Sequence, residues 1–512
     1  MNSQSGLVLE QRRAELRGGL FARLTKALWS LPAILALAML LRLVAIFAFP
    51  NLNFADENYQ LYEQGHRLAF GYGVKPWEFD DGIRSMVVPY AIAGLFAVSE
   101  PLFGGPQGYL WFAQIVFAAL SLVPVATAYQ MGRRISATHA LLAGLVTASW
   151  FEIVYFSSKP LTEALATDFI LVALSLASVP YSEISRRRLA AVGFCLAATV
   201  MLRLQLLPGV VFVAAWLCRL DIQKRWLWLA AGAAPVLILF GATDWLTWGA
   251  PFVSYVRAVW VNVGQSKASA YGFTPLYFYL MFIIAYWNLA AAALIPFIIH
   301  RYRRSVPWVG FAVIVIAVHS LIPHKEYRFI HPALACLVVV ASLGSADFIE
   351  DARGRLGPGR TRLLTAAAAS LWLLASIGLV SSPLFALYRT HWREFIQASF
   401  WVSQRPNLCG LALYDDSWHV TGGYAFLHRN VPIYALKRDH ALASRSTQAF
   451  NFVLLRRGSW PDFQPAYRLA WCAANGSTND LCLAERPGIC SPAPGATPLL
   501  RQSRLGEKPD SD

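Results

Sequence analysis

Charged residues are scarce in this chain. Asp, Glu, Lys and Arg make up only 14% of its 512 residues, against about a quarter in soluble globular domains. Hydrophobic residues reach 56%, and the mean hydropathy is +0.45. This composition excludes a soluble globular protein. It predicts an all-α polytopic membrane protein, because windows of roughly 20 apolar residues, each able to cross about 30 Å of hydrocarbon, recur along the chain.

The apolar windows place the expected membrane spans. They lie near residues 28–49, 108–131, 137–156, 162–180, 226–246, 276–299, 306–323, 332–348 and 363–386. Residues 189–220 predict two shorter spans with a turn at Arg203–Pro208, which brings the total to about eleven. Residues 86–103 predict either one more span or a re-entrant segment.

Acidic residues are fewer than basic ones, 29 against 44, which gives a net charge of +15. Many of the basic residues lie at alternate turns between the predicted spans, as expected for cytoplasmic loops. These are Arg12, Arg13, Arg17, Arg23, Lys26, Arg133, Arg134, Arg186–Arg188, Lys224, Arg225, Arg301, Arg303, Arg304 and the arginines within 353–362. We interpret them as a topology signal only, so a nucleic-acid partner is not implied. Residues 1–27 are then cytoplasmic. No cleavage pattern follows the first apolar run, so that run is expected to be retained as a span.

With this orientation three polar stretches share the outer face: 50–85, 247–275 and 324–329. The turns at 157–161 and 203–207 join them. Outer loops are normally poor in cations, yet these contain Lys75, Arg84, Lys159, Arg203, Arg257, Lys267, Lys325 and Arg328. Some of these side chains are expected to snorkel at the interface. A cluster of them in one outer pocket would suit an anionic ligand such as a phosphate.

Cysteine is also rare, and its positions divide the chain in two. Cys195, Cys218 and Cys336 lie in apolar runs and predict small core residues, whereas Cys409, Cys472, Cys482 and Cys490 lie in the polar tail at 387–500. Four cysteines in an exported domain predict up to two disulfides of open connectivity. The tail alternates short apolar strands with helical stretches, which predicts a small α/β domain outside the cytoplasm. Residues 501–512 are expected to be disordered, and no cysteine lies close enough to histidines to predict a zinc site.

The first outer loop, 50–85, follows the first span of the transmembrane region at 28–386. From Asp56 on, its pattern predicts an amphipathic helix lying flat on the membrane, with Gly71 at its end. Its shared face consists of Tyr59, Tyr62, His66 and Phe70. Asp56 at the start of this helix has two open interpretations. It is either an N-cap or a base that takes a proton from an acceptor hydroxyl.

The segment 324–329 places His324, Lys325, Glu326 and Arg328 between two apolar runs. Ionisable groups at a membrane boundary indicate a functional site. The structural alternative is a turn held by ion pairs with Glu326.

No Asp-x-Asp pair occurs in an ordered loop, since Asp510 and Asp512 lie in the tail. A nucleotide-sugar enzyme would normally need a metal for its diphosphate. An outer carboxylate, a cation cluster and a bundle of spans fit transfer of a sugar from a lipid-linked monophosphate, with neither cofactor nor metal.

Several strings together resemble glycosyltransferase family 22, which includes the dolichyl-phosphate-mannose-dependent α-mannosyltransferases of N-glycan and glycosylphosphatidylinositol assembly. In the first loop they are ADENYQ, EQGHR, GYG, WEF and IRS, followed by DWLTWG at 244–249, YGFTPLYFY at 271–279 and SLIPHKEYRF at 320–329. The resemblance runs in order over about residues 50–335. The tail string TGGYAFLHRNVPIY at 421–434 is similar to the glycosylphosphatidylinositol branch.

The resemblance implies a GT-C fold and an inverting transfer of a hexose, first of all mannose, from a polyprenyl-phosphate donor to a glycan or glycolipid acceptor. It implies Asp56 as the base, with Glu57 supporting it or replacing it. The implied donor phosphate ligands are His324, Lys325, Arg328, Arg84 and Arg203, and the implied substrate contacts are His66, Trp77 and Glu78. Ala55 departs from the residue common in eukaryotic members, which leaves the acceptor open.

A transporter or flippase for lipid-linked sugars is the alternative class. It would be expected to show internal repeats and charges within its spans. No repeat is evident, and the ionisable residues are predicted to lie at span ends, so the enzyme is preferred. Compact loops suggest a bacterial plasma membrane. In the endoplasmic reticulum of a eukaryote, Asn475 in Asn-Gly-Ser would be a glycosylation site.

Overall fold

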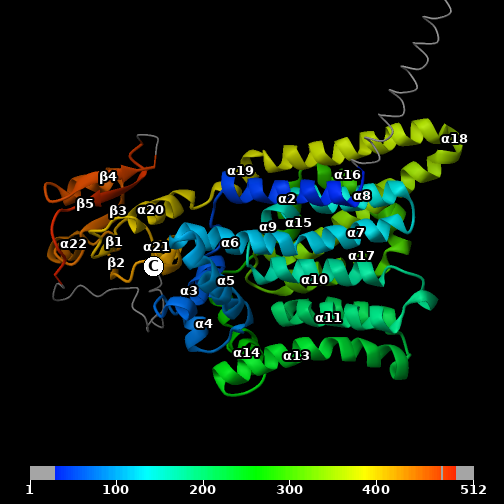
Figure 1. Cartoon of the computed structure of the whole chain (residues 1–512), viewed down its shortest axis with the longest axis horizontal. Helices are drawn as coiled ribbons and strands as arrows, with labels where there is room; N and C mark the ends of the chain where they lie inside the picture. The colour runs from blue at the N-terminus through cyan, green and yellow to red at the C-terminus, as the bar shows by residue number, and fades with distance from the viewer. Residues whose placement is uncertain (1–28, 474–476, 492–512) are drawn as a thin grey trace, which may run out of the picture.

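A bundle of helices with a smaller sheet domain at one end makes up the computed structural model, which describes residues 29–473 and 477–491 (Figure 1). We call this end of the bundle the domain end. The bundle begins with α2 (Leu31–Ala48) and finishes with α18 (His331–Val380), and α19 (Pro383–Thr390) leads into the domain. The predictions for 1–27, Asn475 and 501–512 lie outside the described residues.

The remaining bundle helices are predominantly apolar, as a bilayer requires, because only closed backbone hydrogen bonding is stable there. They are α5 (Val87–Phe103), α6 (Gly105–Leu120), α7 (Leu122–Arg133), α8 (Ala137–Ser149), α9 (Phe151–Phe156), α10 (Thr162–Ala177), α11 (Arg186–Leu202), α12 (Leu207–Cys218), α13 (Leu227–Trp248), α14 (Val253–Val259), α15 (Phe278–Trp287), α16 (Leu289–Arg301) and α17 (Val306–Leu321).

Four helical stretches in the described part are long and apolar enough to cross a membrane by themselves. They are Leu31–Ala48, Gly105–Arg133, Gln223–Trp248 and Tyr327–Val380. The pair 278–287 and 289–304, bent by 105°, makes a fifth if it counts as one span. Val87–Phe103, Ala137–Ser149, Leu204–Cys218 and Val306–Leu321 are shorter apolar helices. The chain is therefore an integral, multi-pass membrane protein.

Four of the predicted spans differ in detail from the observed helices. The window 137–156 is broken at Trp150, whose ψ of 127° is extended, and 276–299 is broken at Asn288, whose φ is 53°. The windows 332–348 and 363–386 lie largely in one 50-residue helix, α18, with a kink at Gly357 (φ 72°) before Pro358. A straight helix of that length would be about 75 Å long, so the kink is what allows two crossings.

The expectation that ionisable residues sit at span ends is wrong for Arg42 and Asp168. Arg42 is fully buried within α2, where its Nε donates to Ser121 Oγ at 2.6 Å and its Nη1 donates to the carbonyl of Ala148 at 3.1 Å. Asp168 of α10 lies close enough to interact electrostatically with it. A charge at this depth is retained because the bundle supplies acceptors and a counter-charge. Because charged residues do lie within the spans, a lack of such charges can no longer be used as an argument against a transporter.

A five-stranded sheet in the order β2-β1-β3-β5-β4 forms the core of the C-terminal domain. The strands are β1 (Leu411–Leu413), β2 (Ile433–Ala435), β3 (Phe452–Arg456), β4 (Arg468–Cys472) and β5 (Leu481–Glu485). β1 runs parallel to β2 and β3, and β5 runs antiparallel to β3 and β4. Alternate residues enter two apolar cores, since Leu411 and Leu413 belong to one and Ala412 to the other. The α/β domain expected from the tail is thus confirmed.

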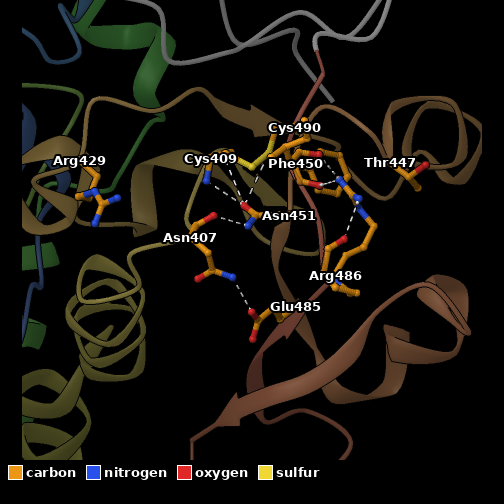
Figure 2. Close-up of a disulfide and its surroundings, with 12 residues drawn as sticks. Asn407, Cys409, Arg429, Thr447, Phe450, Asn451, Glu485, Arg486 and Cys490 are labelled. Atoms are coloured by element: carbon orange, nitrogen blue, oxygen red, sulfur yellow. Dashed lines mark hydrogen bonds between the residues drawn. A yellow bond between two sulfur atoms is a disulfide. The ribbon is translucent and has the colours of Figure 1, made fainter.

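Two disulfides tie this domain together, as predicted from its four cysteines. Cys409 is bonded to Cys490 and Cys472 to Cys482. Figure 2 shows the first of them beside Asn451, whose Oδ1 accepts the Cys409 N–H at 3.0 Å. Cys195, Cys218 and Cys336 are free and buried, also as predicted.

The first outer loop lies at the domain end (Figure 1) and contains η1 (Glu57–Tyr62), α3 (Glu63–Phe70) and α4 (Trp77–Asp80). The predicted helix is present and ends at Gly71 (φ 82°), but η1 is a widened π-helical segment. The prediction that its aromatic face lies on the membrane is wrong. Tyr62 and His66 on that face are fully buried, because α3 packs against α5 and against α21 (Gly423–Leu427) of the sheet domain.

Candidate active site

Asp56 and Arg328 meet at the domain end of the bundle, although 272 residues separate them in the chain. Arg328 Nη2 lies 2.5 Å from Asp56 Oδ2. The Asp56 side chain makes no capping hydrogen bond to η1, so its N-cap interpretation is wrong. The carboxylate is 34% exposed while Arg328 is 4% exposed. An accessible carboxylate is therefore held in place by a buried cation.

Two further carboxylates surround Arg328. Its Nε lies 2.9 Å from Glu326 Oε2 and 3.6 Å from Glu163 Oε1. Burial by itself would raise the pKa of Glu326, but Arg328 and His324 hold it down, to about 2. The predicted ion pairing of the 324–329 segment with Glu326 is therefore present, with His324 Nε2 at 3.1 Å from Glu326 Oε1.

Glu163 also links Arg328 to Arg203. The Arg203 Nη2 atom lies 3.1 Å from Glu163 Oε1, and the guanidinium covers the ring of Phe329 at 4.7 Å. Sequence reasoning missed Glu163, which is fully buried at the start of α10. Its position in the sequence, just after the outer turn 157–161, is the signal that could have identified it as a site residue.

Glu57 is held by a different cation from Asp56. Lys159 Nζ lies 3.0 Å from both Glu57 oxygens, and both side chains are buried. Burial raises the pKa of Glu57, and Lys159 and Arg328 oppose the increase. The two adjacent acids thus face separate partners, and only Asp56 is accessible.

Arg84 and Arg203 line one pocket of about 220 Å³, which we call the arginine pocket. Within the described residues, the buried Nε atoms of both arginines have no hydrogen-bond partner. Gln60, one helical turn after Asp56, also lines this pocket and donates to Glu78 Oε1 at 3.0 Å. Burial raises the pKa of Glu78, Arg84 opposes the increase, and Asp56 adds to it. The pocket therefore places unpaired guanidinium N–H groups close to Asp56.

Three predicted site residues are engaged elsewhere. Lys325 Nζ donates to the carbonyls of Thr274 at 2.9 Å and Ile322 at 2.6 Å, so it binds backbone. His66 is fully buried, with Nε2 at 3.0 Å from His428 Nδ1. The ring of Trp77 lies 3.3 Å from Lys267 Nζ. None of these three lines the arginine pocket.

A second, mostly apolar cavity of about 360 Å³ lies between α2, α9 and α18. We call it the apolar cavity. Asn51, Lys159 and Arg389 are among its polar lining residues, and Lys159 is the partner of Glu57. Each cavity therefore includes a residue next to the acidic pair Asp56–Glu57: Gln60 of the same helical segment lines the arginine pocket, and Lys159, the partner of Glu57, lines the apolar cavity.

Comparison with protein families gives a match to the Alg9-like mannosyltransferase family over residues 33–428, that is, from α2 to the end of α21. The chain belongs to this family. It is a membrane mannosyltransferase. GPI mannosyltransferase 3 from Yarrowia lipolytica is 27% identical over 393 residues, which cover 74% of this chain and 72% of that protein. Human GPI alpha-1,2-mannosyltransferase 3 is 26% identical over 332 residues, which cover 60% and 56%.

Among solved structures the mannosyltransferase resembles ArnT from Cupriavidus metallidurans. The apo form gives a TM-score of 0.60 at 13% identity, and the form bound to undecaprenyl phosphate gives 0.54 at 12%. Each comparison covers 90% of this chain and 98% of ArnT. At this identity the likeness shows the fold, which confirms the predicted GT-C architecture.

Proposed function

We propose that the enzyme transfers mannose, with inversion, from a polyprenyl-phosphate donor to a glycan or glycolipid acceptor, and that Asp56 is the base. The observation that carries this proposal is the accessible Asp56 carboxylate, 2.5 Å from Arg328 and on the same helical segment as Gln60, which lines the arginine pocket. Within the described residues Oδ2 of Asp56 accepts the hydrogen bond from Arg328, and Oδ1 stays available for an acceptor hydroxyl.

The arginine pocket suits the donor phosphate, because Arg84 and Arg203 both line it. In the part of the chain that the structure describes, the Nε atom of each has no hydrogen-bond partner, while Nη2 of Arg203 is paired with Glu163. Asp56 takes the proton from the acceptor hydroxyl, and the hydroxyl oxygen bonds to the anomeric carbon of the sugar. The bond from that carbon to the phosphate oxygen breaks, and its electron pair stays on the phosphate. Fixed positive groups stabilise the charge that develops there. Arg328, saturated by three carboxylates, orients the base.

The apolar cavity suits the hydrocarbon chain of a lipid-linked substrate. Its lining comes mainly from apolar side chains of membrane helices, and its polar end lies at Lys159 beside Glu57. Two separate cavities, one lined by Arg84 and Arg203 and the other by Lys159, would allow a lipid-linked donor and a lipid-linked acceptor to bind at the same time. ArnT, which shares the fold, has a solved structure with undecaprenyl phosphate bound, and this supports a polyprenyl-phosphate donor.

The proposed compartment is a bacterial plasma membrane with the site on its outer side. The two disulfides of the sheet domain, at the same end as Asp56, support an oxidising environment.

The test of the proposed base is Asp56→Asn, assayed with a panel of labelled polyprenyl-phosphate sugars. We expect kcat to fall about 10²- to 10⁴-fold, because the amide cannot accept the proton. The matched control is Asp80→Asn in the same loop, whose carboxylate is 31% exposed and pairs with Lys75 at 2.7 Å. Transfer at the wild-type rate by a folded Asp56→Asn protein would exclude Asp56 as the base.

We propose also that transfer requires no divalent metal, because a monophosphate leaving group can be neutralised by arginines. Activity is expected to be the same after dialysis against EDTA as before it. Loss on chelation, restored by one added metal, would contradict this.

A further inference from the structure

Glu63 is a fully buried carboxylate in the first loop that the proposed reaction does not use. Its two oxygens accept three backbone N–H groups. Oε1 accepts from Val74 at 2.7 Å and Tyr424 at 3.2 Å, and Oε2 accepts from Ala425 at 2.7 Å. Tyr424 and Ala425 belong to α21 of the sheet domain. One side chain of the loop thus binds the backbone of a domain more than 360 residues away.

Two glycines lie so close to the Glu63 carboxylate that a side chain at either position would crowd it. Gly423 has φ +56°, and a Cβ there would lie 2.8 Å from Glu63 Oε2. Gly73 has φ +152°, and a Cβ there would lie 3.1 Å from Oε1. Backbone from both sides therefore approaches Glu63 as closely as only glycine permits.

Other contacts also join the first loop to the sheet domain, and we call this contact region the junction. The hydroxyl of Tyr59 lies 3.0 Å from Thr421 Oγ1, and the hydroxyl of Tyr109 donates to the carbonyl of Ala425 at 2.5 Å. Tyr59 and Val74 of the loop belong to one of the two apolar cores of the sheet domain. The loop is consequently part of that domain's interior as well as part of the active site.

We propose that Glu63 is a positioning residue that fixes the first loop on the sheet domain and so holds Asp56 against Arg328. This rests on the proposed role of Asp56. Asp56 and Glu63 lie on one continuous helical segment, with η1 between them, so a shift at one end is transmitted to the other. The sheet domain would then control turnover without contacting either substrate.

The test compares Glu63→Gln with Gly423→Ala, which disturb the same contact from opposite sides. The amide of Gln points an N–H toward backbone N–H groups, and the methyl of Ala meets Oε2. We expect both variants to lower kcat at least tenfold with the KM for the donor unchanged, at temperatures well below each variant's Tm. Glu183→Gln, an exposed carboxylate on η2 (Tyr181–Glu183), is the matched control and should keep wild-type kinetics.

Tyr109→Phe supplies a milder third variant in case the other two fail to fold. It removes one hydrogen bond of the junction and keeps the ring, so kcat is expected to fall about fivefold. Wild-type kcat in the folded variants, or a change confined to KM, would overturn the proposal. Asp56→Asn distinguishes failure of the proposed base from failure of the positioning role. It should lower kcat about 10²- to 10⁴-fold while the junction keeps its resistance to proteolysis. If Asp56→Asn is fully active, the proposed base is wrong, whereas wild-type kcat in Glu63→Gln together with a slow Asp56→Asn would show that only the positioning role is wrong.

Discussion

Arg328 contacts three carboxylates from separate parts of the chain: Asp56 before η1, Glu163 at the start of α10, and its near neighbour Glu326. A guanidinium offers several N–H donors in a fixed plane, which a lysine ammonium does not. The residue type is therefore matched to its contacts. With three anions around it, Arg328 has little capacity to bind a phosphate, which is why we propose Arg84 and Arg203 for that role.

A pH effect is expected from His66. Burial lowers its pKa from the ordinary 6.5 to about 3, and the neighbouring His428 adds to this. Between these values the unfolded chain binds a proton that the folded protein excludes, so the free energy of unfolding falls as the pH decreases from 6.5 toward 3. The loss is about 2 kcal/mol at pH 5.

Thermal unfolding in detergent at pH 7.5 and pH 5 measures this effect. His66→Asn should show a smaller difference in Tm between the two values than the wild type. His300→Asn, which removes a largely exposed histidine, should leave the difference unchanged. An equal pH dependence in His66→Asn would show that His66 is not the group responsible.

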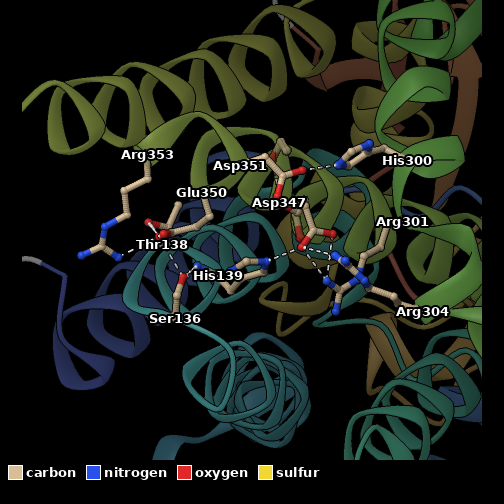
Figure 3. Close-up of polar contacts among 12 residues, drawn as sticks. Ser136, Thr138, His139, His300, Arg301, Arg304, Asp347, Glu350, Asp351 and Arg353 are labelled. Carbon is tan, nitrogen blue, oxygen red and sulfur yellow. Dashed lines mark hydrogen bonds and ion pairs between the residues drawn. The ribbon is translucent and has the colours of Figure 1, made fainter. Parts of the chain in front are cut away.

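At the scale of elements, Asp347 joins three helical segments away from the site. Figure 3 shows Arg301, Arg304 and His139 around it. Arg301 Nη1 lies 2.7 Å and His139 Nε2 lies 2.9 Å from Asp347 Oδ1. The interpretation of Arg301 and Arg304 as a topology signal only is therefore wrong, since both also bind α18 to the end of α16.

Asp347→Asn should destabilise the protein by about 3–5 kcal/mol, because it leaves the buried Arg301 without its counter-charge. Specific activity of the folded fraction should stay at the wild-type level, since the cluster does not touch the site. Asp351→Asn on the same helix is the control. Its carboxylate is 64% exposed and, among the described residues, pairs with His300 alone, so the Tm should hardly change. Equal losses of stability in Asp347→Asn and Asp351→Asn would show that the buried cluster around Asp347 contributes no more to stability than the exposed pair of Asp351.

At the scale of the whole molecule, the two disulfides close loops of very different length. Cys409–Cys490 spans 81 residues and Cys472–Cys482 spans 10. A longer loop removes more entropy from the unfolded chain, by about 2 kcal/mol for this difference. We expect the double Cys→Ser variant of the first pair to lose more resistance to proteolysis in the sheet domain than that of the second. The opposite order would show that local packing outweighs loop entropy.

Much of the fold was predictable because the signals are local. Apolar windows, the end of α3 at Gly71, the free buried cysteines and the α/β tail follow from composition and short spacing. The breaks at Trp150 and Asn288 were not predictable, because both lie inside largely apolar runs where a bent helix and a straight one have the same hydropathy.

The sequence by itself determined that the chain is a polytopic membrane protein, and its motifs pointed to a glycosyltransferase with Asp56 and the 324–329 segment at its site. Only the tertiary structure decided which groups are partners. It paired Asp56 with Arg328, Glu57 with Lys159 and Glu63 with α21, and it engaged His66 and Lys325 inside the protein. The reason is that the two residues of each contact are far apart in the chain, from about 50 to more than 360 positions. At such separations the charge and spacing of residues in the chain do not specify their distance in space.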